Sequence, residues 1–507
     1  MAIVETEKMT PLDVVDRDYR ILIGGEMVGA SDGGIDDVVD PSTGEVVAHV
    51  PRGTPDDIHR AVTVAAQAQP EWNKLGVKGR GDALRELGAA IAEHAEELAI
   101  IDSVDSGNPL DAMRMDVQLS LKYYDWWPGV ALTMEGRAVE ASPGNLHYTK
   151  HVPYGVVGRI TAFNHPGMFA MKSIVVALVA GNSMVLKPSD QTPLAALRFA
   201  EIANEILPPG VLNVVTGGVE TGDALVVDPR VKRIGFTGSV ATGLKIQQRA
   251  AGVAVKHVSL ELGGKNALIA FPDVDPVALA NEAVYGMNME ICQGQSCGST
   301  SRVLVHESIA DEFIEALRMR IGDVRVGKAY EEGTTMGPLV SAKHHRHVTG
   351  LIESGKQEGA TVVTGGGIPD HTPAGGFFVE PTVFADVDPS FRIANEEIFG
   401  PVICVMPWND LDTAIEVANS LPYGLTGSVW THDLDLAHTT ADRLDAGYVW
   451  INDTAKHFLG MPFGGTKNSG TGREDSIEEL YDHMETKVIH TMLGNPASAL
   501  KRLTGIT

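Results

Sequence analysis

Two cysteines stand five positions apart in a polar, glycine-rich stretch of the sequence. The stretch EICQGQSCGSTSR, residues 290–302, contains Cys292 and Cys297. A thiol in such surroundings differs from the usual buried cysteine, and it becomes a nucleophile when a helix terminus, a cation or a base lowers its pKa from about 8.5. The residues alone do not decide between these two thiols. Cys404 lies in the apolar run PVICVMPW and is expected in the core.

Asn164 and Glu261 follow two predicted strands and have the chemistry to assist a thiol. Asn164 comes after the apolar run RITAF, and its side chain would either donate an N–H to a developing oxyanion or cap the next helix. Glu261 stands between two leucines at the end of KHVSLEL. Desolvation there would raise its pKa toward that of a general base, and the alternative is a strand residue that faces solvent.

Two further stretches have features of a nucleotide site. FTGSVATG (236–243) puts Gly238 and Ser239 between a strand and a helix, where the backbone approaches a ligand closely and the helix N-terminus favours a phosphate. It is not the G-x-G-x-x-G dinucleotide pattern, and a plain glycine turn is the alternative. VLKPSD ends a strand with Lys187 and Asp190, which would lie beside a ribose or form a solvated surface pair.

These stretches lie at the junctions of alternating strands and helices. Between residues 155 and 262, apolar runs such as GVVGRITAF, SMVLKP, LNVVTG and RIGFTG alternate with helical stretches. Such alternation predicts βαβ units and a parallel sheet, which binds ligands at the carboxyl ends of its strands. Residues 259–470 repeat the alternation, with strands expected at 301–306 and 426–431, and predict a second α/β domain.

The N-terminal part predicts short strands followed by helices. Residues 20–50 contain apolar runs broken by glycine and turn residues. Thr54 precedes Pro55, Asp56 and Asp57, which is the pattern of a capped helix start. A single further helix is predicted from the apolar face formed by Leu84, Leu87, Ile91, Ala95 and Leu98.

The composition is that of an ordinary globular protein and excludes several kinds of partner. The 507 residues include 40 Lys and Arg against 66 Asp and Glu, a formal net charge of −26. This charge repels nucleic acid and anionic lipid surfaces, and the longest apolar run, residues 174–180, is too short to span a bilayer. Three cysteines without metal-ligand spacing fit a reducing compartment, and the N-terminal stretch lacks an apolar signal core. We therefore expect a cytoplasmic protein without nucleic-acid, membrane or metal partners.

Seven ordered stretches together resemble the aldehyde dehydrogenase superfamily, over about residues 20–490. They are FNHPG (163–167), LKPSDQTPL (186–194), FTGSVATG (236–243), LELGGKN (260–266), GQSCGSTSR (294–302), EEIFGPV (396–402) and PFGGTKNSGTGRE (462–474). The resemblance implies an α/β fold with a Rossmann-like cofactor domain, a second α/β catalytic domain and a small β oligomerisation arm. It implies an NAD-binding domain at 1–130 and 154–258, a catalytic domain at 259–470, and the arm with a C-terminal tail at 131–153 and 471–507.

The same resemblance implies roles for individual residues. The family's catalytic thiol ends a Gly-Gln-x-Cys segment, which selects Cys297, with Glu261 as the general base and Asn164 as the oxyanion amide. The implied cofactor-binding residues are Phe163, Lys187, Asp190, Gly222, Gly238, Ser239, Leu262, Gly263, Glu397 and Phe399. The implied substrate-pocket residues are Trp127, Met168, Met171, Ser296, Phe458 and Phe463.

The reaction implied is oxidation of an aldehyde to the carboxylic acid, through a cysteine thiohemiacetal, hydride transfer and hydrolysis of a thioester. Asp190 stands where the family more often has Glu, and its charge should still repel a 2′-phosphate. NAD is therefore the expected cofactor, with NADP possible. The sequence departs from the family's usual pattern at Phe163, at His165 and in a slightly longer loop before Cys297, which leaves the substrate open.

An apolar, partly aromatic pocket implies an aromatic or medium-sized apolar aldehyde. Lys172, Lys456 and His457 would instead receive a carboxylate, which makes a semialdehyde acid the alternative. A cofactor-independent thiol hydrolase or acyltransferase and a catalytically silent binding protein are rival interpretations, and the retained cofactor and catalytic residues argue against them. The alternating strands expected at 135–153 and 483–492 imply a homodimer or homotetramer.

Overall fold

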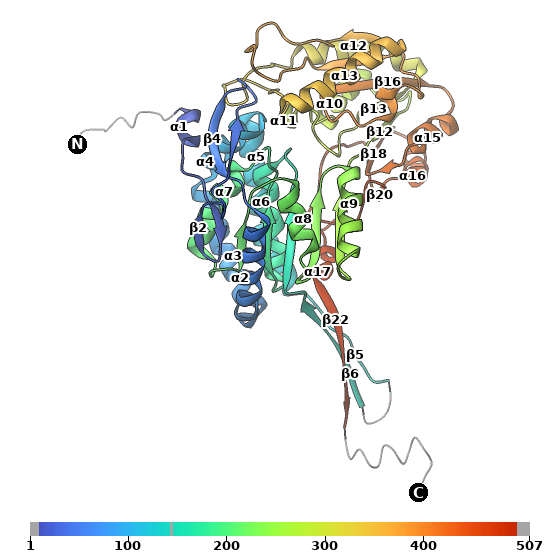
Figure 1. Cartoon of the computed structure of the whole chain (residues 1–507). Coiled ribbons are helices and arrows are strands. Elements are labelled where there is room, and N and C mark those ends of the chain that lie inside the picture. The colour runs from blue at the N-terminus through green and yellow to red at the C-terminus, as the bar shows by residue number, and fades with distance from the viewer. Residues whose placement is uncertain (1–9, 142–144, 494–507) are drawn as a thin grey trace, which may run out of the picture.

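The computed structural model describes residues 10–141 and 145–493, which form two α/β bodies and a projecting arm (Figure 1). The first body contains an eight-stranded sheet and the second a seven-stranded sheet. Within the described ranges, no helix is long and apolar enough to cross a bilayer. The predicted α/β fold class is confirmed.

The first sheet has the strand order β2-β1-β9-β8-β7-β10-β11-β21. Its parallel part consists of β9 (Leu212–Val214), β8 (Ser183–Lys187), β7 (Val156–Ile160), β10 (Val231–Thr237) and β11 (His257–Glu261). Antiparallel strands close its two edges: β1 (Ile21–Ile23) with β2 (Glu26–Val28), and β21 (Gly470–Thr471). Strands β7 and β8 are buried along their whole length, as expected when helices cover both faces.

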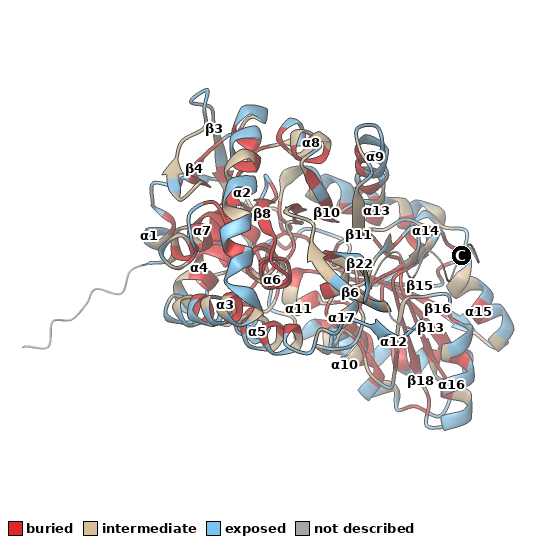
Figure 2. Cartoon of the chain, turned by 90° about the horizontal axis from the view of Figure 1, so that it is seen from below, coloured by how far each residue is buried: buried red, intermediate tan, exposed pale blue. Residues whose placement is uncertain are grey.

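Helices pack around this sheet and bury their apolar sides against it (Figure 2). They are α1 (Pro11–Val15), α2 (Pro55–Lys74), α3 (Gly76–Glu93), α4 (Ala95–Ser106), α5 (Leu110–Ala131), α6 (Pro166–Val179), α7 (Leu194–Ile206), α8 (Val219–Val227) and α9 (Val240–Ala251). The strand and helix alternation predicted between residues 155 and 262 is confirmed.

The N-terminal helices confirm one prediction and correct another. Thr54 caps α2, because its hydroxyl accepts the Asp57 N–H at 3.2 Å and the Asp57 carboxylate accepts the Thr54 N–H at 3.0 Å. The single helix predicted through Leu84 and Leu98 is wrong, since the chain breaks at His94 between α3 and α4. There the His94 Nδ1 lies 2.9 Å from Glu97, which also pairs with Arg198 at 2.9 Å. These side-chain contacts stabilise the break between the two helices, and the spacing of the apolar residues does not predict them.

The second sheet has the strand order β14-β15-β16-β13-β12-β18-β19, parallel except for β14. The strands are β14 (Thr361–Thr364), β15 (Thr382–Ala385), β16 (Val402–Trp408), β13 (Arg302–His306), β12 (Ala267–Ala270), β18 (Thr426–Trp430) and β19 (Tyr448–Ile451). Their flanking helices are α10 (Pro276–Gly286), α12 (Glu307–Gly322), α13 (Ala342–Glu358), α15 (Leu411–Asn419) and α16 (Leu434–Arg443). The strands predicted at 301–306 and 426–431 are confirmed as β13 and β18.

The second sheet has a separate apolar core on each face. Leu304 of β13 packs into one core, whereas Val303 and Val305 pack into the other, as the pleat requires. Cys404 lies fully buried in the first of these cores, as predicted. Shorter elements connect the two bodies or lie at their surface: β3 (Ile35–Val39), β4 (Val46–Pro51), α11 (Met289–Cys292), α14 (Arg392–Asn395), β17 (Tyr423–Gly424), β20 (Thr466–Lys467) and α17 (Ile477–Asp482).

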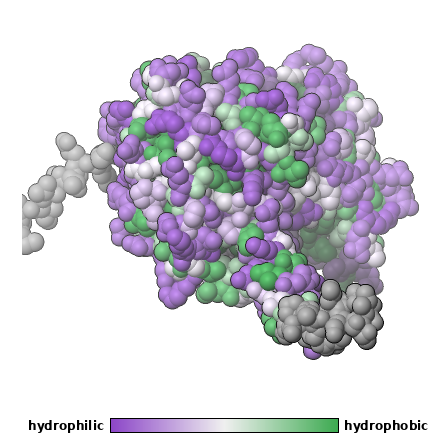
Figure 3. Space-filling model, turned by 60° about the horizontal axis from the view of Figure 1, so that its bottom comes forward, coloured by the Kyte–Doolittle hydropathy of each residue, from purple (hydrophilic) through white to green (hydrophobic). Residues whose placement is uncertain are grey.

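The arm is an antiparallel sheet of β5 (Ala138–Val139), β6 (Asn145–Pro153) and β22 (Met484–Met492) that projects from the first body (Figure 1). It exposes apolar side chains such as Leu146, Val488 and Met492. The surface seen in Figure 3 is mostly hydrophilic, with scattered apolar patches. The predicted strands are thus present, and their predicted role in association stays a prediction.

The domain limits also stay a prediction. The first sheet contains β11 up to Glu261 and regains β21 from the far end of the chain, so it extends beyond the predicted limit at residue 258. Parts of the predicted domains, residues 1–9, 142–144 and the tail 494–507, lie outside the described residues.

Candidate active site

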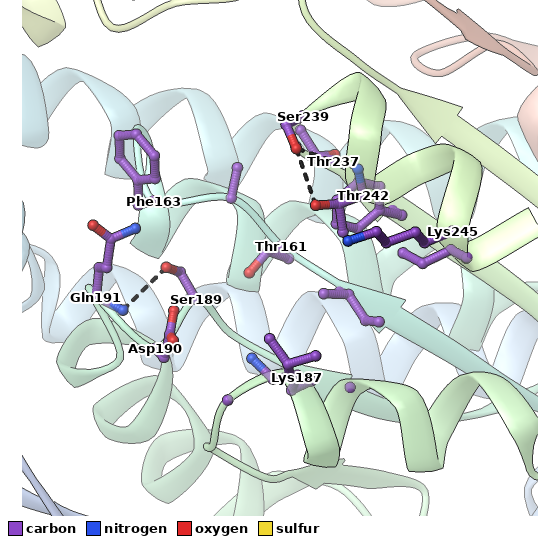
Figure 4. Close-up of a pocket in the computed structure, with 18 of the residues that line it drawn as sticks. Thr161, Phe163, Lys187, Ser189, Asp190, Gln191, Thr237, Ser239, Thr242 and Lys245 are labelled. Carbon is purple, nitrogen blue, oxygen red and sulfur yellow. Dashed lines mark hydrogen bonds between the residues drawn. The ribbon is translucent and has the colours of Figure 1, made fainter. Parts of the chain in front are cut away.

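A groove of about 1150 Å³ runs along the carboxyl ends of the parallel strands of the first body. Strands β7, β8, β10 and β11 end near Asn164, Lys187, Gly238 and Glu261, and all four residues line it. This placement follows from topology, because neighbouring parallel strands end at the same edge of their sheet. Figure 4 shows Lys187, Ser189 and Asp190 on one side of the groove, with Ser239, Thr242 and Lys245 opposite them.

The implied cofactor-binding residues meet in this groove, with one exception. Those that line it are Phe163, Lys187, Asp190, Gly222, Gly238, Ser239, Gly263, Glu397 and Phe399. Leu262 is buried instead, and it packs where a side chain at Gly243 of α9 would stand. That these residues bind a cofactor stays a prediction, and the structure shows where they lie around the groove.

One end of the groove places a buried amine beside an exposed carboxylate. Lys187 is buried, and its Nζ donates to the Pro188 carbonyl at 2.9 Å. Burial lowers the pKa of Lys187, and the nearby charge of Asp190 opposes that shift. Ser239 caps α9 by accepting the Thr242 N–H at 3.4 Å, so the helix N-terminus faces the same space.

Glu397 and Phe399 also line the groove. The Gly264 N–H donates to Glu397 Oε1 at 2.9 Å, and a Cβ at Gly263 would collide with the same carboxylate, so a side chain there would displace Glu397. Burial raises the pKa of Glu397 to about 7. Phe399 has a φ of +55° and sets its ring edge-on to Phe163, with centroids 5.6 Å apart.

His344 is a groove residue that sequence reasoning missed. Its Nε2–H donates to the Phe399 carbonyl at 2.6 Å, and its ring lies 5.8 Å from that of Phe163. Burial lowers the pKa of His344 to about 4, so the imidazole is neutral. It belongs to α13, and no motif in the residues SAKHHRHV marks it.

Asn164, Glu261 and Cys297 all line the groove, and Glu261 is close enough to Cys297 for its charge to act on the thiol. Glu261 is buried at the end of β11, and its Oε2 has no hydrogen-bond partner among the described residues. The alternative of a solvent-facing strand residue is therefore wrong. Burial raises the pKa of Glu261 well above its usual value, and the charge of Glu474 adds to the effect. Glu474 itself stays ionised because Arg159 lies 2.8 Å from its carboxylate and outweighs its burial.

Cys297 is half-buried at the surface of the groove. Burial, with the nearby charges of Glu261 and Glu397, raises the pKa of its thiol well above the usual value. The Asn266 side chain holds the Cys297 carbonyl at 2.7 Å. Within residues 10–141 and 145–493, neither the Cys297 backbone N–H nor the Asn164 side-chain amide donates to a protein acceptor. Both donors are thus free to bind an oxygen.

Asn164 is fixed through its backbone. The buried Asn108 side chain donates to the Asn164 carbonyl at 2.8 Å, and the following helix α6 begins with its Gly167 N–H on the buried carboxylate of Asp102. The Asn164 side chain therefore needs no partner of its own to hold its place. The helix-capping alternative does not apply, because His165 occupies the cap position of α6.

Cys292 takes a different position from Cys297. It ends the short helix α11, and its side chain is fully buried. The next residue, Gln293, turns the chain with a φ of +55°. Cys297 can therefore be reached from the groove and Cys292 cannot, a difference that the sequence alone did not show.

The implied substrate-pocket residues fall into three groups. Met168 and Ser296 are half-buried, Phe463 is buried, and Phe458 is 54% exposed. Trp127 and Met171 lie fully inside the first core. None of the six lines the groove, so their contact with a substrate stays a prediction. No group of three or more His, Cys, Asp or Glu side chains in the described ranges is arranged to hold a metal ion.

Known proteins match this sequence over nearly its whole length. Residues 29–489 match the model of the aldehyde dehydrogenase family. Aldehyde dehydrogenase tropH of Talaromyces stipitatus is 43% identical over 482 residues, which cover 92% of each chain. A betaine aldehyde dehydrogenase of Rhizobium etli is 40% identical, over 93% of this chain and 97% of the relative.

Solved structures show the same fold. An NAD+ complex of an aldehyde dehydrogenase from Bacillus cereus superposes with a TM-score of 0.91 at 37% identity, over 95% of this chain and 98% of the other. The chain therefore belongs to the aldehyde dehydrogenase family and is an oxidoreductase of the aldehyde dehydrogenase class.

Proposed function

We propose that this enzyme oxidises an aldehyde to its carboxylic acid with NAD as hydride acceptor and Cys297 as nucleophile. The observation that carries the proposal is that three chemically suited groups line one groove. They are a half-buried thiol, a buried carboxyl without a hydrogen-bond partner, and a side-chain amide that is free to donate.

The groove fits an elongated dinucleotide. Its volume of about 1150 Å³ exceeds that of most small-molecule pockets, which is about 300–1,000 Å³. Lys187 has three amine hydrogens and uses one on Pro188, so two remain for ribose hydroxyls. Glu397 would hold the second ribose, and the cap of α9 at Ser239 would face the phosphates.

The Cys297 thiol gives its proton to water in the groove, and the first bond then forms between Cys297 Sγ and the aldehyde carbon. The carbonyl electrons move to the oxygen, and this oxyanion is held by the two free donors, the Asn164 amide and the Cys297 backbone N–H. Nicotinamide bound in the groove would supply the acceptor for the hydride that leaves the substrate carbon. Cys297 then carries a thioester. The wall of the groove is held in place by the turn at Phe399, which has a positive φ, and by the Glu397 carboxylate, which accepts the Gly264 N–H.

Glu261 completes the reaction as general base. Its carboxylate takes a proton from water, the water oxygen attacks the thioester carbon, and the carbon–sulfur bond breaks to release the acid and the Cys297 thiolate. The raised pKa of Glu261 suits this role, because a stronger base removes the proton more readily.

NAD is favoured over NADP by charge. Asp190 is exposed at the groove edge beside Lys187, so a 2′-phosphate there would meet a carboxylate that forms no ion pair with any described residue. The cofactor-independent hydrolase interpretation is disfavoured, because a hydrolase would not need a groove large enough for a dinucleotide.

An aromatic or medium-sized apolar aldehyde remains the proposed substrate. The semialdehyde alternative relied on Lys172, Lys456 and His457 as receivers of a carboxylate. Lys456 pairs with Asp453 at 2.7 Å, and Lys172 lies 3.5 Å from both Glu474 and Asp475. Both lysines are thus already neutralised by acids, which weakens the alternative.

The test is cofactor reduction followed by absorbance across an aldehyde panel, with wild type and the Cys297→Ala variant. Wild type should reduce NAD with benzaldehyde, and Cys297→Ala should lose at least roughly three orders of magnitude in kcat. Cys404→Ala is the matched control, since that thiol is buried in the second body, and it should keep activity. An unchanged rate in Cys297→Ala would overturn the proposal.

A further inference from the structure

A second, much smaller cavity lies at the amino ends of three neighbouring strands of the second sheet. Its volume is about 20 Å³, and the first residues of β12, β13 and β18, which are Ala267, Arg302 and Thr426, line it. Lys265 and Asn266, which precede β12, line it as well. The cavity shares no lining residue with the cofactor groove, so the two are separate spaces.

Two buried cations line this cavity without an acid to neutralise them. Lys265 is 1% exposed and Arg302 is 3% exposed. Among the described residues, Lys265 Nζ has no hydrogen-bond partner, and the Arg302 side chain donates only to backbone carbonyls. A buried charge is normally paired, because burial removes the water that would solvate it. The site therefore lacks a negative charge.

The same two side chains have hydrogen-bond donors to spare. Arg302 Nε donates to the Lys265 carbonyl at 2.8 Å, and its two terminal nitrogens donate to the Val417 and Ala418 carbonyls in the last turn of α15, each also at 2.8 Å. These three bonds fix the guanidinium and leave two of its five N–H groups. The Lys265 amine keeps all three of its hydrogens.

The acids of this region do not supply the missing charge. Asp445 also lines the cavity, but it is exposed and its carboxylate lies 2.9 Å from the Lys467 amine. The charges of Glu396 and Glu397 act on Lys265 through space. Within the described ranges, neither carboxylate forms an ion pair with that amine, because Arg392 holds the first and the Gly264 N–H holds the second.

The size of the cavity selects the kind of occupant. A volume of about 20 Å³ holds one guest of about the size of a water molecule, which excludes phosphate, sulfate and carboxylates. A halide of the size of chloride accepts hydrogen bonds from every side and carries the missing charge, and hydrogen bonds between ions are stronger than neutral ones. Water would accept some of the hydrogen bonds but would leave both cations uncompensated.

Asn266 and Thr426 connect the cavity to the loop that contains Cys297. The Asn266 side-chain amide donates to the carbonyls of Cys297 and Ser299, at 2.7 and 2.9 Å. The Thr426 hydroxyl donates to the Gly298 carbonyl at 3.2 Å. Two residues that line the cavity thus hold three successive carbonyls of this loop.

We propose that this cavity binds one chloride-sized anion against Lys265 and Arg302, and that the bound anion steadies the loop that presents Cys297. The proposal does not depend on the proposed function, because it concerns the charge and the packing behind the loop.

Bromide locates the site directly, because it takes the place of chloride and scatters X-rays anomalously. Crystals of the full chain, grown without halide and soaked in sodium bromide, should show an anomalous peak within hydrogen-bond distance of Lys265 Nζ and the Arg302 guanidinium. An ordered water without anomalous signal at that place, or an empty cavity, would overturn the proposal.

Two measurements in solution compare sodium chloride with sodium gluconate at equal ionic strength, since gluconate is too large for the cavity. The Tm of the wild type should rise with chloride along a one-site saturation curve, to roughly 2 °C or more above its value in gluconate. Hydrogen exchange of a peptide that covers residues 294–302 should be slower in chloride by at least about twofold.

Lys265→Met removes one cation at nearly the same side-chain shape and should abolish both effects of chloride. In gluconate this variant should melt at or above the temperature of the wild type, because it lacks the unpaired buried charge. Lys356→Met, which changes an exposed lysine on α13, is the matched control and should keep both effects.

The solution measurements also show whether the ion belongs to the protein. A bromide peak without a chloride-dependent Tm, or a chloride effect that persists in Lys265→Met, would mean an adventitious ion only and would overturn the proposal. Equal exchange rates of residues 294–302 in chloride and gluconate would overturn the role of the anion at the Cys297 loop.

Discussion

The cofactor groove and a neighbouring cluster of side chains are built in different ways. The cluster consists of His165, Phe169 and Lys172 at helix α6, and we call it the α6 wall; its members contact one another but do not line the groove. The groove is formed by strand ends and turns, such as β8 with Lys187 and the cap of α9 at Ser239, each from one continuous stretch of chain. The wall is formed by side chains paired across long sequence separations, such as His165 with Asp116 and Lys172 with Asp475.

This difference predicts how the two regions respond to mutation. Backbone donors and helix termini keep their places when a single side chain changes, so groove variants should alter affinity gradually. Removing one partner of a buried ion pair leaves an uncompensated charge, at a cost of roughly 3–5 kcal/mol. Variants of the wall should therefore lower stability.

Glu261 lies at the junction of the two regions and gives the largest expected effect. Because its pKa is raised by burial and by Glu474, the fraction of carboxylate grows as the pH rises, and kcat of the wild type should increase from neutral to alkaline pH. Glu261→Gln should lose about 10²–10⁴-fold in kcat and the corresponding pH dependence.

Rapid-mixing measurement of cofactor reduction checks this expectation. The Glu261→Gln variant should show a burst of reduced cofactor, because hydride transfer proceeds and thioester hydrolysis stalls. Glu220→Gln, an exposed acid that also lines the groove, should behave as the wild type. A variant that turns over without a burst and at the wild-type rate would remove Glu261 from the reaction.

Asp190 tests the groove side, with a smaller effect. Loss of its charge in Asp190→Asn should raise the kcat/KM ratio of NADP to NAD by roughly tenfold, which corresponds to about 1.4 kcal/mol of relieved repulsion. The ratio is measured by steady-state kinetics with both cofactors. Asp311→Asn, exposed on α12 of the second body, is the control. An unchanged ratio would mean that the 2′-phosphate does not approach Asp190.

Much of the groove could be predicted from the sequence because its residues follow local rules. Alternating apolar runs predicted the strand ends, and the residues after Thr54 predicted a helix start. Parallel strands then bring Lys187, Gly238 and Glu261 to one edge of the sheet. The choice of Cys297 over Cys292 came from the resemblance, because composition treats the two thiols alike.

The α6 wall could not be predicted in the same way. Asp116 and His165 are 49 residues apart, and Tyr123 donates to Asp475 at 2.8 Å across a separation of 352 residues. Such pairs form only when α5, α6 and the chain before α17 are packed together. The break at His94 has the same origin, since Glu97 and Arg198 meet only in the folded chain. Apolar periodicity contains no information about these partners.

Cys292 offers the smallest expected effect and the sharpest check on the comparison. Its thiol is fully buried against His165, on the wall side of the site, and it contributes to the charge state of that imidazole. Serine keeps a polar group at this place and is similar in size, so Cys292→Ser should retain kcat/KM for ethylbenzaldehyde within about threefold of the wild type.

Alkylation of the native enzyme followed by peptide mass analysis should modify Cys297 and leave Cys292 unmodified, since only Cys297 reaches the groove. If Cys292→Ser instead lost activity as completely as Cys297→Ala, Cys292 would take part in bond making, and the assignment of Cys297 as the reacting thiol would fail.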